Sequence, residues 1–385
     1  MKVGFQVAAN FGGTGLGYIG YQAARGMSDA GILAAITCIG HEKSDIPEEI
    51  ITDVPSARAL SLLVPRRIAN KLGTDALLQQ NYFGLVASRK CRNCDIIHGY
   101  TGQMLETIRA AGRRGARCVV DRPNTHIHFM RRVLEAEYKK HAVPFAAYRP
   151  SRIRREAREL DECDAIVTCS EFARKTMVQE GVDEKKIHVV PYGVDLGLFR
   201  PEPRRDDVFR VVFAGLICLR KGVQYLLEAW DQLGIGEAEL VLQGHLLDDA
   251  VGLLDHFRNR CCFTVRPHTG NMDDLRRLYN SASLCVFPSV EDGFGMVVTE
   301  AMACNRPVLV TEHMGAAEVV TDGVDGFVVP PANAEAIKEK IDYLYKHRGS
   351  AIGLNCRERV AGLTWGAYRA GLLSVYRKIG GEPGE

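Results

Sequence analysis

Two carboxylates and two glycines fall within one short segment, FPSVEDGFGMVVTEAMACNRPVLVT, Phe287 to Thr311. Gly293 and Gly295 let the backbone approach a ligand closely, and MVVTEAMA then predicts a helix whose free N–H groups would face that ligand. A diphosphate suits this position. Glu300 lies one turn into the predicted helix, where a carboxylate can accept two hydrogen bonds from a vicinal diol such as a ribose. Asp292 lies on the loop before it.

Two adjacent cations, Arg220 and Lys221, lie in the stretch GLICLRKGVQYLLEAW between a predicted strand and a predicted helix. Side chains at such a place can project into a cleft and neutralise phosphate charge. The alternative is that both are solvated loop cations, as most Arg-Lys pairs are. The preceding strand and the following Gly222 favour the functional interpretation.

The N-terminal half adds a histidine, His98, which lies at the predicted end of a strand in DIIHGYTGQM. A lone histidine at such a place is usually structural. Its position in the predicted cleft nevertheless makes it a candidate for contacting the reacting substrate.

Two places have the spacing of partial metal sites. Cys91 and Cys94, in CRNC, have the spacing of a zinc half-site, but no second C-x-x-C follows. His126 and His128, in NTHIH, alternate so that both could lie on one side of a strand, but they lack carboxylate neighbours. We therefore expect no metal site.

A glycine-rich stretch, NFGGTGLGYIGYQAARGM, satisfies the G-x-G-x-x-G pattern of dinucleotide sites with Gly15, Gly17 and Gly20. That fingerprint needs its first glycine at the end of the strand, whereas Gly15 lies seven residues beyond Ala8, the predicted strand end. Gly12 and Gly13 lie nearer to the strand and do not fit the pattern. We interpret the loop as a backbone cradle for a substrate or its phosphate.

Two alternatives for this loop remain. One is a turn that only packs a helix on a sheet. The other is an NAD site, in which Glu42, after the second predicted strand, would hold a ribose.

Apolar runs of strand length alternate with helix-period segments, which predicts βαβ units and parallel sheets. The predicted strands of the first half are Val3 to Ala8, Ile32 to Ile39, Ile96 to Gly99, Ala116 to Asp121, Ala165 to Thr168 and Ile187 to Val190. Pro191 to Arg210 is proline-rich and charged, typical of a linker. The strands that follow are Val211 to Leu216, Ala238 to Gln243, Cys262 to Val265, Ser283 to Pro288, Pro307 to Thr311 and Gly326 to Val329.

Helices are predicted in both halves. Those of the second half include Val223 to Trp230, Leu275 to Ser281, one capped by Asn333, and a terminal segment, TWGAYRAGLLSVYRKI. At 385 residues the chain is too long for one ordinary core. We expect an α/β fold with two doubly wound domains, and a ligand at the carboxyl ends of the strands in the cleft between them.

Composition narrows the class of protein further. With 46% hydrophobic and 25% charged residues and a net charge of +2, the chain is typical of a globular protein, and its charge gives no argument for nucleic acid. No apolar stretch approaches the ~20 residues of a membrane-spanning helix, and the N-terminus does not resemble a signal peptide. Twelve cysteines, many in apolar runs, suit a reducing cytoplasm.

Several long segments, in order, resemble the retaining nucleotide-sugar glycosyltransferases of family 4, also called group 1 glycosyltransferases, which have the GT-B fold. The resemblance runs over nearly the whole chain. It includes the Gly12, Gly13 and Gly15 loop, DAIVTCSEFARKTMVQEGVDEKKIHVVPYGVDLGLFRP, RKG, EDGFGMVVTEAMACNRPVL and the terminal helix. It implies two Rossmann-like domains: residues 1–195, which bind the acceptor and are joined by the C-terminal helix 364–385, and residues 196–363, which bind the nucleotide-sugar.

The resemblance also implies roles for particular residues. Glu300 would hold the donor ribose, and Lys221 would steady the departing diphosphate. Asp292 would face the donor sugar, His98 would lie near the transferred sugar, and the Gly12 to Gly15 loop would approach the phosphates from the other domain. The remaining donor contacts are expected from Glu291, Gly293, Phe294, Gly295, Met296 and Val297, and, around the base, from Gly244, Arg266, Pro267 and His268.

Two positions depart from the family pattern. Asp292 stands where the family more often has Glu, and the neighbouring Glu291 is a candidate to compensate. Leu216 stands where an arginine is frequent, five residues before Lys221, and Arg220 is a candidate to replace it.

The expected reaction is a metal-independent transfer of the sugar from a nucleoside-diphosphate sugar, with a UDP-sugar as the expected donor, to an acceptor hydroxyl with retention. Lys221, Arg220 and the helix N-terminus would stabilise the leaving diphosphate, so no cofactor is expected. The alternatives are a catalytically silent nucleotide-sugar-binding subunit and an NAD-linked oxidoreductase.

The acceptor is expected to be a carbohydrate, a lipid-linked compound or a small molecule, and no nucleic-acid partner is expected. We expect a cytoplasmic protein. The arginines of FMRRV and YRPSRIRREARE leave two interpretations open: contact with the inner face of a membrane, or a solvated charged helix face.

Overall fold

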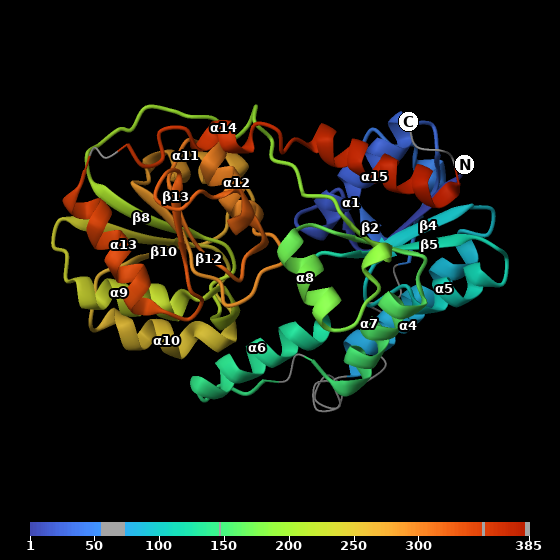
Figure 1. Cartoon of the computed structure of the whole chain (residues 1–385), viewed down its shortest axis with the longest axis horizontal. Helices are drawn as coiled ribbons and strands as arrows, with labels where there is room; N and C mark the ends of the chain where they lie inside the picture. The colour runs from blue at the N-terminus through green and yellow to red at the C-terminus, as the bar shows by residue number, and fades with distance from the viewer. Residues whose placement is uncertain (55–73, 146–147, 349–350, 382–385) are drawn as a thin grey trace.

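The computed structural model describes residues 1–54, 74–145, 148–348 and 351–381, and within them the chain forms two lobes (Figure 1). The first lobe is built on a seven-stranded parallel sheet of order β3-β2-β1-β4-β5-β6-β7. Its strands are β1 (Val3–Phe11), β2 (Leu33–His41), β3 (Ile51–Asp53), β4 (Ile96–Tyr100), β5 (Arg117–Arg122), β6 (Ala165–Thr168) and β7 (Ile187–Val189). Its helices are α1 (Leu16–Asp29), α4 (Thr74–Lys90), α5 (Leu105–Gly112), α6 (Ile127–Lys140), α7 (Pro150–Glu162) and α8 (Glu171–Gln179).

The second lobe is built on a six-stranded parallel sheet of order β10-β9-β8-β11-β12-β13. Its strands are β8 (Phe209–Ala214), β9 (Ala238–Gln243), β10 (Thr264–Arg266), β11 (Leu284–Phe287), β12 (Val308–Thr311) and β13 (Gly326–Val329). The helices are α9 (Val223–Leu233), α10 (Asp248–Arg258), α11 (Met272–Ser281), α12 (Met296–Ala303), α13 (Ala334–Lys346), α14 (Cys356–Val360) and α15 (Trp365–Gly380). Short 3₁₀ turns cover Glu48–Ile50, Glu184–Lys186, Leu219–Lys221 and Gly315–Val319.

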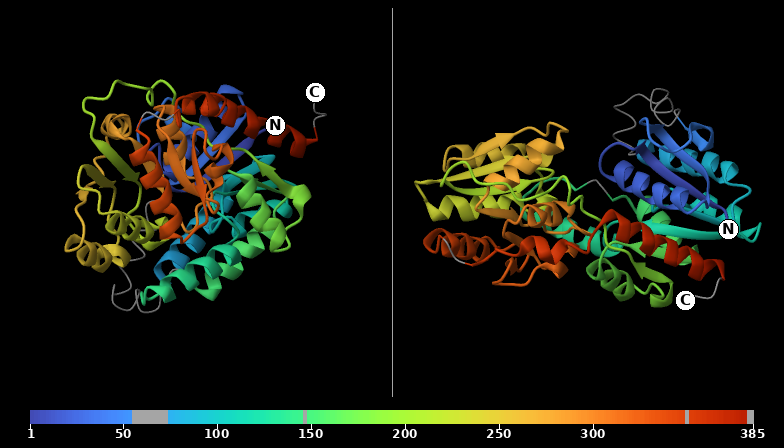
Figure 2. Two further views of the ribbon diagram at one scale, coloured as in Figure 1. Left: turned by 60° about the vertical axis from the view of Figure 1, so that its left-hand side comes forward. Right: turned by 90° about the horizontal axis from the view of Figure 1, so that it is seen from above.

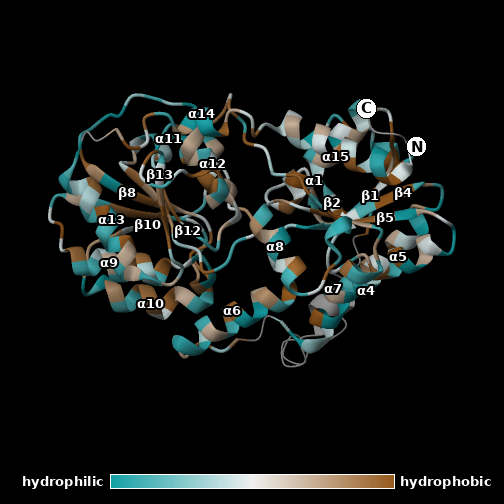
Figure 3. Ribbon diagram, viewed as in Figure 1, coloured by the Kyte–Doolittle hydropathy of each residue, from teal (hydrophilic) through white to brown (hydrophobic). Residues whose placement is uncertain are grey.

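The central strands are apolar because helices cover both faces of each sheet, as in other doubly wound folds. Strands β8, β11 and β12 are buried along their whole length, and the hydropathy colouring shows the strands as the most apolar part of each lobe (Figure 3). The predicted fold class, two doubly wound α/β domains, is therefore confirmed, and each predicted strand lies within a few residues of an observed one.

Two segments cross between the lobes side by side. The predicted linker, Pro191 to Arg210, contains no helix and joins β7 to β8. Val194 in it donates a backbone hydrogen bond of 2.8 Å to Leu363, just before α15. Helix α15 then runs back over the first lobe and packs against α1, where Arg369 lies 3.3 Å from Asp29 (Figure 2).

Helix α6 belongs to the first lobe in sequence but packs its apolar face on the core of the second. Met130 and Leu134 are both 2% exposed and belong to the same hydrophobic cluster as Val223 and Leu226 of α9. Buried Glu137 accepts hydrogen bonds from Gln224 (2.8 Å) and Tyr225 (2.7 Å). The two lobes are thus held together by a packed helix as well as by the crossing segments.

The expectation that His126 and His128 share one side of a strand is wrong. His126 is the N-cap of α6, and its ring nitrogen accepts a hydrogen bond of 3.3 Å from the His128 amide. The chain leaves β5 at Arg122, and the proline at 123 ends the strand pairing there.

No helix in the described ranges combines the length and the apolar composition needed to cross a membrane.

Candidate active site

The glycine-containing loop between β11 and α12 lies at the carboxyl end of the second sheet. Gly295 is the N-cap of α12 and has a left-handed backbone, with φ of 90°, which favours glycine. Two backbone hydrogen bonds hold the loop against the segment after β12. The Asp292 amide donates to the His313 carbonyl (2.9 Å), and the Asp292 carbonyl accepts from the Gly315 amide (3.0 Å). The first turn of α12 contains no acidic residue of its own, and the Asp292 carboxylate lies beside the helix N-terminus, since a Cβ at Gly295 would lie 3.5 Å from its Oδ2.

Lys221 reaches this loop from the neighbouring strand. It ends the short turn after β8, and its ammonium group pairs directly with the Asp292 carboxylate. Gly222 follows with φ of 72°, and a Cβ there would overlap the carbonyl oxygen of Pro288. Burial favours the neutral form of Asp292, but Lys221 and Arg220 outweigh it, so the pKa of this carboxyl lies below its usual range. The structure therefore brings together a cation, an anion and a helix N-terminus.

Arg220 and Glu291 occupy different places from those expected. Glu291 is fully buried, and its carboxylate is bound by Arg220 Nε (2.8 Å) and by Thr125 Oγ1 (2.6 Å). Arg220 Nη2 also donates to Asn124 Oδ1 at 2.9 Å. Because both oxygens of Glu291 are engaged, this residue does not stand in for the shorter Asp292, and the pair instead joins the second lobe to the β5–α6 loop of the first.

Further contacts join the lobes at the same loop. The carbonyl oxygen of Gly293 accepts a hydrogen bond of 2.7 Å from Ser170 Oγ, and a Cβ at Gly293 would overlap the Pro123 carbonyl. Phe294 is buried against Tyr192 of the first lobe, with ring centroids 5.4 Å apart. The close approach explains why position 293 is a glycine, a role that differs from direct contact with a ligand.

Glu300 lies one turn into α12, as predicted, and is 6% exposed. Its Oε2 accepts a hydrogen bond of 3.2 Å from Tyr279. Burial raises the pKa of Glu300 to about 7, and the Tyr279 hydrogen bond opposes this shift. A desolvated carboxylate of this kind gains when a diol supplies hydrogen bonds to it. The sequence analysis missed Tyr279, because no motif or residue spacing in the sequence connects α11 with Glu300.

The glycine loop of the first lobe follows a strand that is three residues longer than predicted. Strand β1 ends at Phe11, so Gly12, with φ of 84°, comes directly after it. Gly15, the N-cap of α1, has φ of 58°, and a Cβ there would meet nothing within 4 Å. Gly17, by contrast, has the Asn10 carbonyl against it. The loop thus has an open side at Gly15 and a packed side at Gly17.

Met296 and Val297 begin α12 in the other lobe and are half-buried.

His98 differs from the expectation that it contacts a substrate. It is fully buried in the middle of β4, and its Nδ1 lies 2.6 Å from the Tyr376 hydroxyl of α15. Its Nε2 lies 3.8 Å from Asp121. Burial lowers the pKa of His98 to about 3 and raises that of Asp121 to about 8, so burial disfavours the charged form of both side chains.

Around Asp121 and His98 lies a buried polar cluster that the sequence did not reveal. Several of its atoms have no hydrogen-bond partner among the described residues: His98 Nε2, both Asp121 carboxylate oxygens and the hydroxyls of Tyr100, Tyr192 and Tyr368. Buried groups of this kind are normally satisfied by ordered water.

The residues expected around the donor base lie at the ends of β9 and β10. Gly244 has φ of 158°, close to extended backbone, and the Gly215 carbonyl leaves no room for a side chain there. His268 is exposed and faces His245, with ring centroids 5.0 Å apart. Arg266 and Pro267 line a cavity of about 510 Å³ with Gln243.

Four arginines of the two basic stretches pair with carboxylates. In α7, Arg152 lies 2.7 Å from Glu156 and Arg155 lies 3.2 Å from Glu159. In α6, Arg131 and Arg132 pair with Glu135 (3.2 Å) and Glu180 (2.9 Å). The α7 carboxylates are buried, so these α7 pairs lie inside the lobe, whereas Arg154 and Arg158 of the same helix are exposed.

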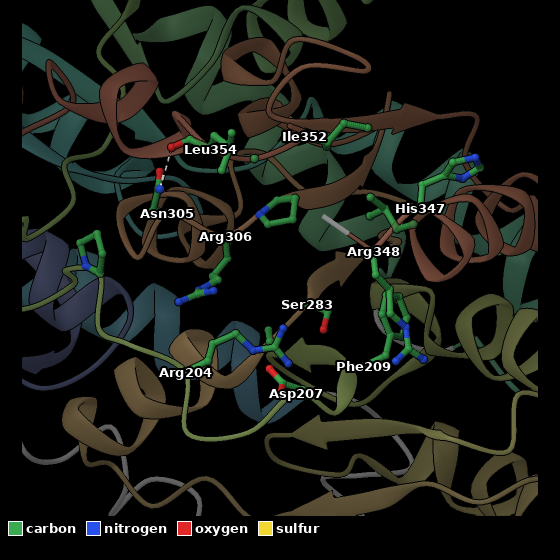
Figure 4. Close-up of a pocket in the computed structure, with 15 residues that line it drawn as sticks. Arg204, Asp207, Phe209, Ser283, Asn305, Arg306, His347, Arg348, Ile352 and Leu354 are labelled. Atoms are coloured by element: carbon green, nitrogen blue, oxygen red, sulfur yellow. Dashed lines mark hydrogen bonds between the residues drawn. The ribbon is translucent and has the colours of Figure 1, made fainter. Parts of the chain in front are cut away.

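A separate cavity of about 460 Å³ lies at the opposite end of the second sheet (Figure 4). Arg204, Phe209, Ser283 and Arg306 line it where β8, β11 and β12 begin. Ligands of doubly wound sheets bind at the carboxyl ends of strands. We therefore place the candidate active site at the loops that carry Lys221, Asp292 and Glu300, and not in this cavity.

Comparison with known proteins defines the class. Residues 15–198 match the model "Glycosyltransferase Family 4" and residues 208–347 match "Glycosyl transferases group 1". Among solved structures, sucrose-phosphate synthase from Thermosynechococcus elongatus has a TM-score of 0.73 at 19% identity, covering 98% of this chain and 99% of that one. Anabaena HepE in complex with UDP-glucose has a TM-score of 0.71 at 16% identity, covering 98% and 100%. The fold is GT-B, two Rossmann-like domains.

The chain belongs to the group 1 glycosyltransferases of family 4. Curated relatives include D-inositol 3-phosphate glycosyltransferase of Mycobacterium tuberculosis, which is 30% identical over 60% of this chain and 52% of the relative. This chain thus matches about half the length of these relatives.

Proposed function

We propose that this protein is a retaining glycosyltransferase that moves a sugar from a UDP-sugar to an acceptor hydroxyl without a catalytic metal ion. Family membership supports the reaction class. The observation that carries the proposal is the direct pair of Lys221 and Asp292 beside the N-terminus of α12.

The chemistry needs positive potential where the diphosphate leaves. Breaking the bond between the anomeric carbon and the diphosphate develops negative charge on the phosphate oxygens and oxocarbenium character on the sugar. Lys221 and the α12 amides supply fixed positive charge at one side of the site. Asp292, kept ionised by its low pKa, supplies negative charge toward the sugar. In this proposal the acceptor hydroxyl attacks from the face that the diphosphate leaves, and the diphosphate accepts its proton.

A uridine nucleotide is the donor that we propose. HepE, which has the same fold, has been solved with UDP and with UDP-glucose, and a pneumococcal O-GlcNAc transferase, GtfA, has been solved with UDP and GlcNAc. In this chain Glu300 would accept hydrogen bonds from the ribose hydroxyls, and the loop at Gly244 and Arg266 would face the base. The acceptor that we propose is a carbohydrate or another hydroxyl compound.

Slow hydrolysis tests the reaction without knowledge of the acceptor. The purified chain is incubated with a panel of α-linked UDP-sugars, and the released sugar is followed by proton NMR before its anomers equilibrate. We expect the α anomer to form first, at the same rate with and without added Mg²⁺ or Mn²⁺. Asp292→Asn should abolish release, whereas Asp255→Asn, an exposed change on α10, should not.

Two results would contradict the proposal. Initial release of the β anomer would exclude retention, and a rate that depends on added Mg²⁺ or Mn²⁺ would exclude the metal-independent mechanism. Nucleotide binding without any turnover would instead identify a catalytically silent binding subunit.

A further inference from the structure

A cysteine, a histidine and an aspartate converge at the edge of the first sheet, away from the donor-site residues described above. Cys38 and His41 lie on β2, and Asp53 is the last residue of β3. The two strands are parallel, and Cys38 is the register partner of Asp53. Cys38 and His41 are three residues apart, which strict alternation would place on opposite faces. Both side chains nevertheless meet Asp53.

The separations between their potential ligand atoms are short. Asp53 Oδ1 lies 3.1 Å from Cys38 Sγ and 3.0 Å from His41 Nδ1. All three ligand atoms lie within 4.8 Å of one another, and no other three histidine, cysteine, aspartate or glutamate side chains in the described part of the chain come together in this way. Zinc bonds of about 2.0 Å to nitrogen or oxygen and about 2.3 Å to sulfur place tetrahedral ligands roughly 3.3 to 3.6 Å apart. The two separations from Asp53 are a few tenths of an ångström shorter than this range, and the separation of Cys38 from His41 is no more than 4.8 Å.

The chemistry and exposure of the three groups point to a particular ion. A thiolate, an imidazole and a carboxylate are together typical of a zinc-class cation and unlike the all-oxygen sets that hold magnesium or calcium. Cys38 is fully buried, whereas the side chains of His41 and Asp53 are 26% and 39% exposed. The buried sulfur would anchor the ion, and the exposed side leaves both an entry path and room for a water as fourth ligand.

We propose that Cys38, His41 and Asp53 bind one Zn²⁺ ion. The ion would fasten β3, an edge strand of three residues, to the end of β2. His41 is the register partner of Phe11, the residue before Gly12, so the site also holds β2 against the glycine loop. This role is structural and does not depend on the proposed transfer reaction.

The CRNC pair differs from this site in its surroundings. Cys91 and Cys94 are buried, and Gly4 of β1 lies so close that a Cβ on it would come within 2.8 and 2.9 Å of their sulfurs. Among the described residues, no third histidine, cysteine, aspartate or glutamate completes a group with this pair.

Cobalt spectroscopy on the full chain, without a histidine tag, tests the proposal. Co²⁺ bound to Cys38 should give a thiolate-to-metal charge-transfer band that saturates at one ion per chain, and Zn²⁺ should displace it. Cys38→Ser should lose the band, whereas Cys262→Ser, which removes an exposed cysteine in the other lobe, should retain it. Asp53→Asn keeps the side-chain shape and should weaken Zn²⁺ binding at least roughly tenfold in competition with a chromophoric chelator.

Thermal unfolding supplies a second readout if Cys38→Ser does not fold. Zn²⁺ should raise the melting temperature of the wild type but not that of Asp53→Asn or His41→Gln. Absence of the charge-transfer band in the wild type, or equal Zn²⁺ affinity in wild type and Asp53→Asn, would overturn the proposal. In that case the three side chains form only a hydrogen-bonded group.

Discussion

The buried carboxyl of Asp121 should make the stability of the first lobe fall as pH rises. Asp121 is 1% exposed, and its oxygens have no hydrogen-bond partner among the described residues. Burial raises its pKa to about 8. His98 Nε2 lies 3.8 Å from the Asp121 carboxylate, and burial lowers the pKa of His98 to about 3. Five further groups lie around it, each with a pKa well above its ordinary value: Tyr100, Tyr192, Tyr368, Tyr376 and Cys169. No charge from them compensates Asp121.

The sign and magnitude follow from linkage. An aspartate in the unfolded chain has a pKa of about 3.9, so between pH 4 and 8 the folded state holds a proton that the unfolded state has released. Stability therefore falls by about 1.4 kcal/mol per pH unit in this window. From pH 6 to 8 the loss is about 2 kcal/mol, because Asp121 begins to ionise near pH 8. Asp121→Asn has no such proton and should gain that amount relative to wild type.

Tryptophan fluorescence can follow the urea unfolding of the first lobe alone. The chain has two tryptophans, and Trp365 lies in the core of the first lobe while Trp230 lies in the second. In a Trp230→Phe background, the advantage of Asp121→Asn should grow by about 2 kcal/mol from pH 6 to 8. Asp161→Asn, an exposed change on α7, should show a constant difference. A constant difference for Asp121→Asn would refute the reasoning.

Two further substitutions test how the lobes are joined. Gly293→Ala forces a methyl group onto the Pro123 carbonyl and should speed hydrogen exchange in the β5–α6 loop. Gly236→Ala, with open space around it, should leave that exchange unchanged. Equal exchange in the two variants would contradict the contact between Gly293 and Pro123. Leu134→Ala leaves a cavity where α6 meets the second lobe and should lower stability by about 2 to 5 kcal/mol. Arg131→Ala, exposed on the same helix, should change stability by less than about 1 kcal/mol, and similar losses for both would count against α6 as a packed bridge.

The positions of most strands and of Glu300 could be predicted because they depend on local signals. Strands buried on both faces appear as apolar runs, and glycines mark the turns after them. Gly295, followed by an apolar helix, therefore identified the helix N-terminus where Glu300 lies. These features need little knowledge of the tertiary structure.

The partners of the site residues could not be predicted because they come from distant segments. Glu291 is bound by Thr125, far away in sequence, and His98 is buried by Tyr376 of α15. The docking of α6 on the second lobe also depends on how the lobes face each other. The group of Cys38, His41 and Asp53 arises from the register of two strands, and the sequence carries no spacing motif for it.

The central claim, a nucleotide-sugar site at Lys221, Asp292 and Glu300, is tested most directly by calorimetric titration of UDP. The wild type should bind UDP, and Lys221→Met should bind it roughly 10- to 150-fold more weakly, since a hydrogen bond to a charged group contributes about 1.5 to 3 kcal/mol. Lys338→Met, which removes an exposed lysine of α13, should bind as the wild type does. Equal affinity in wild type and Lys221→Met would contradict the site.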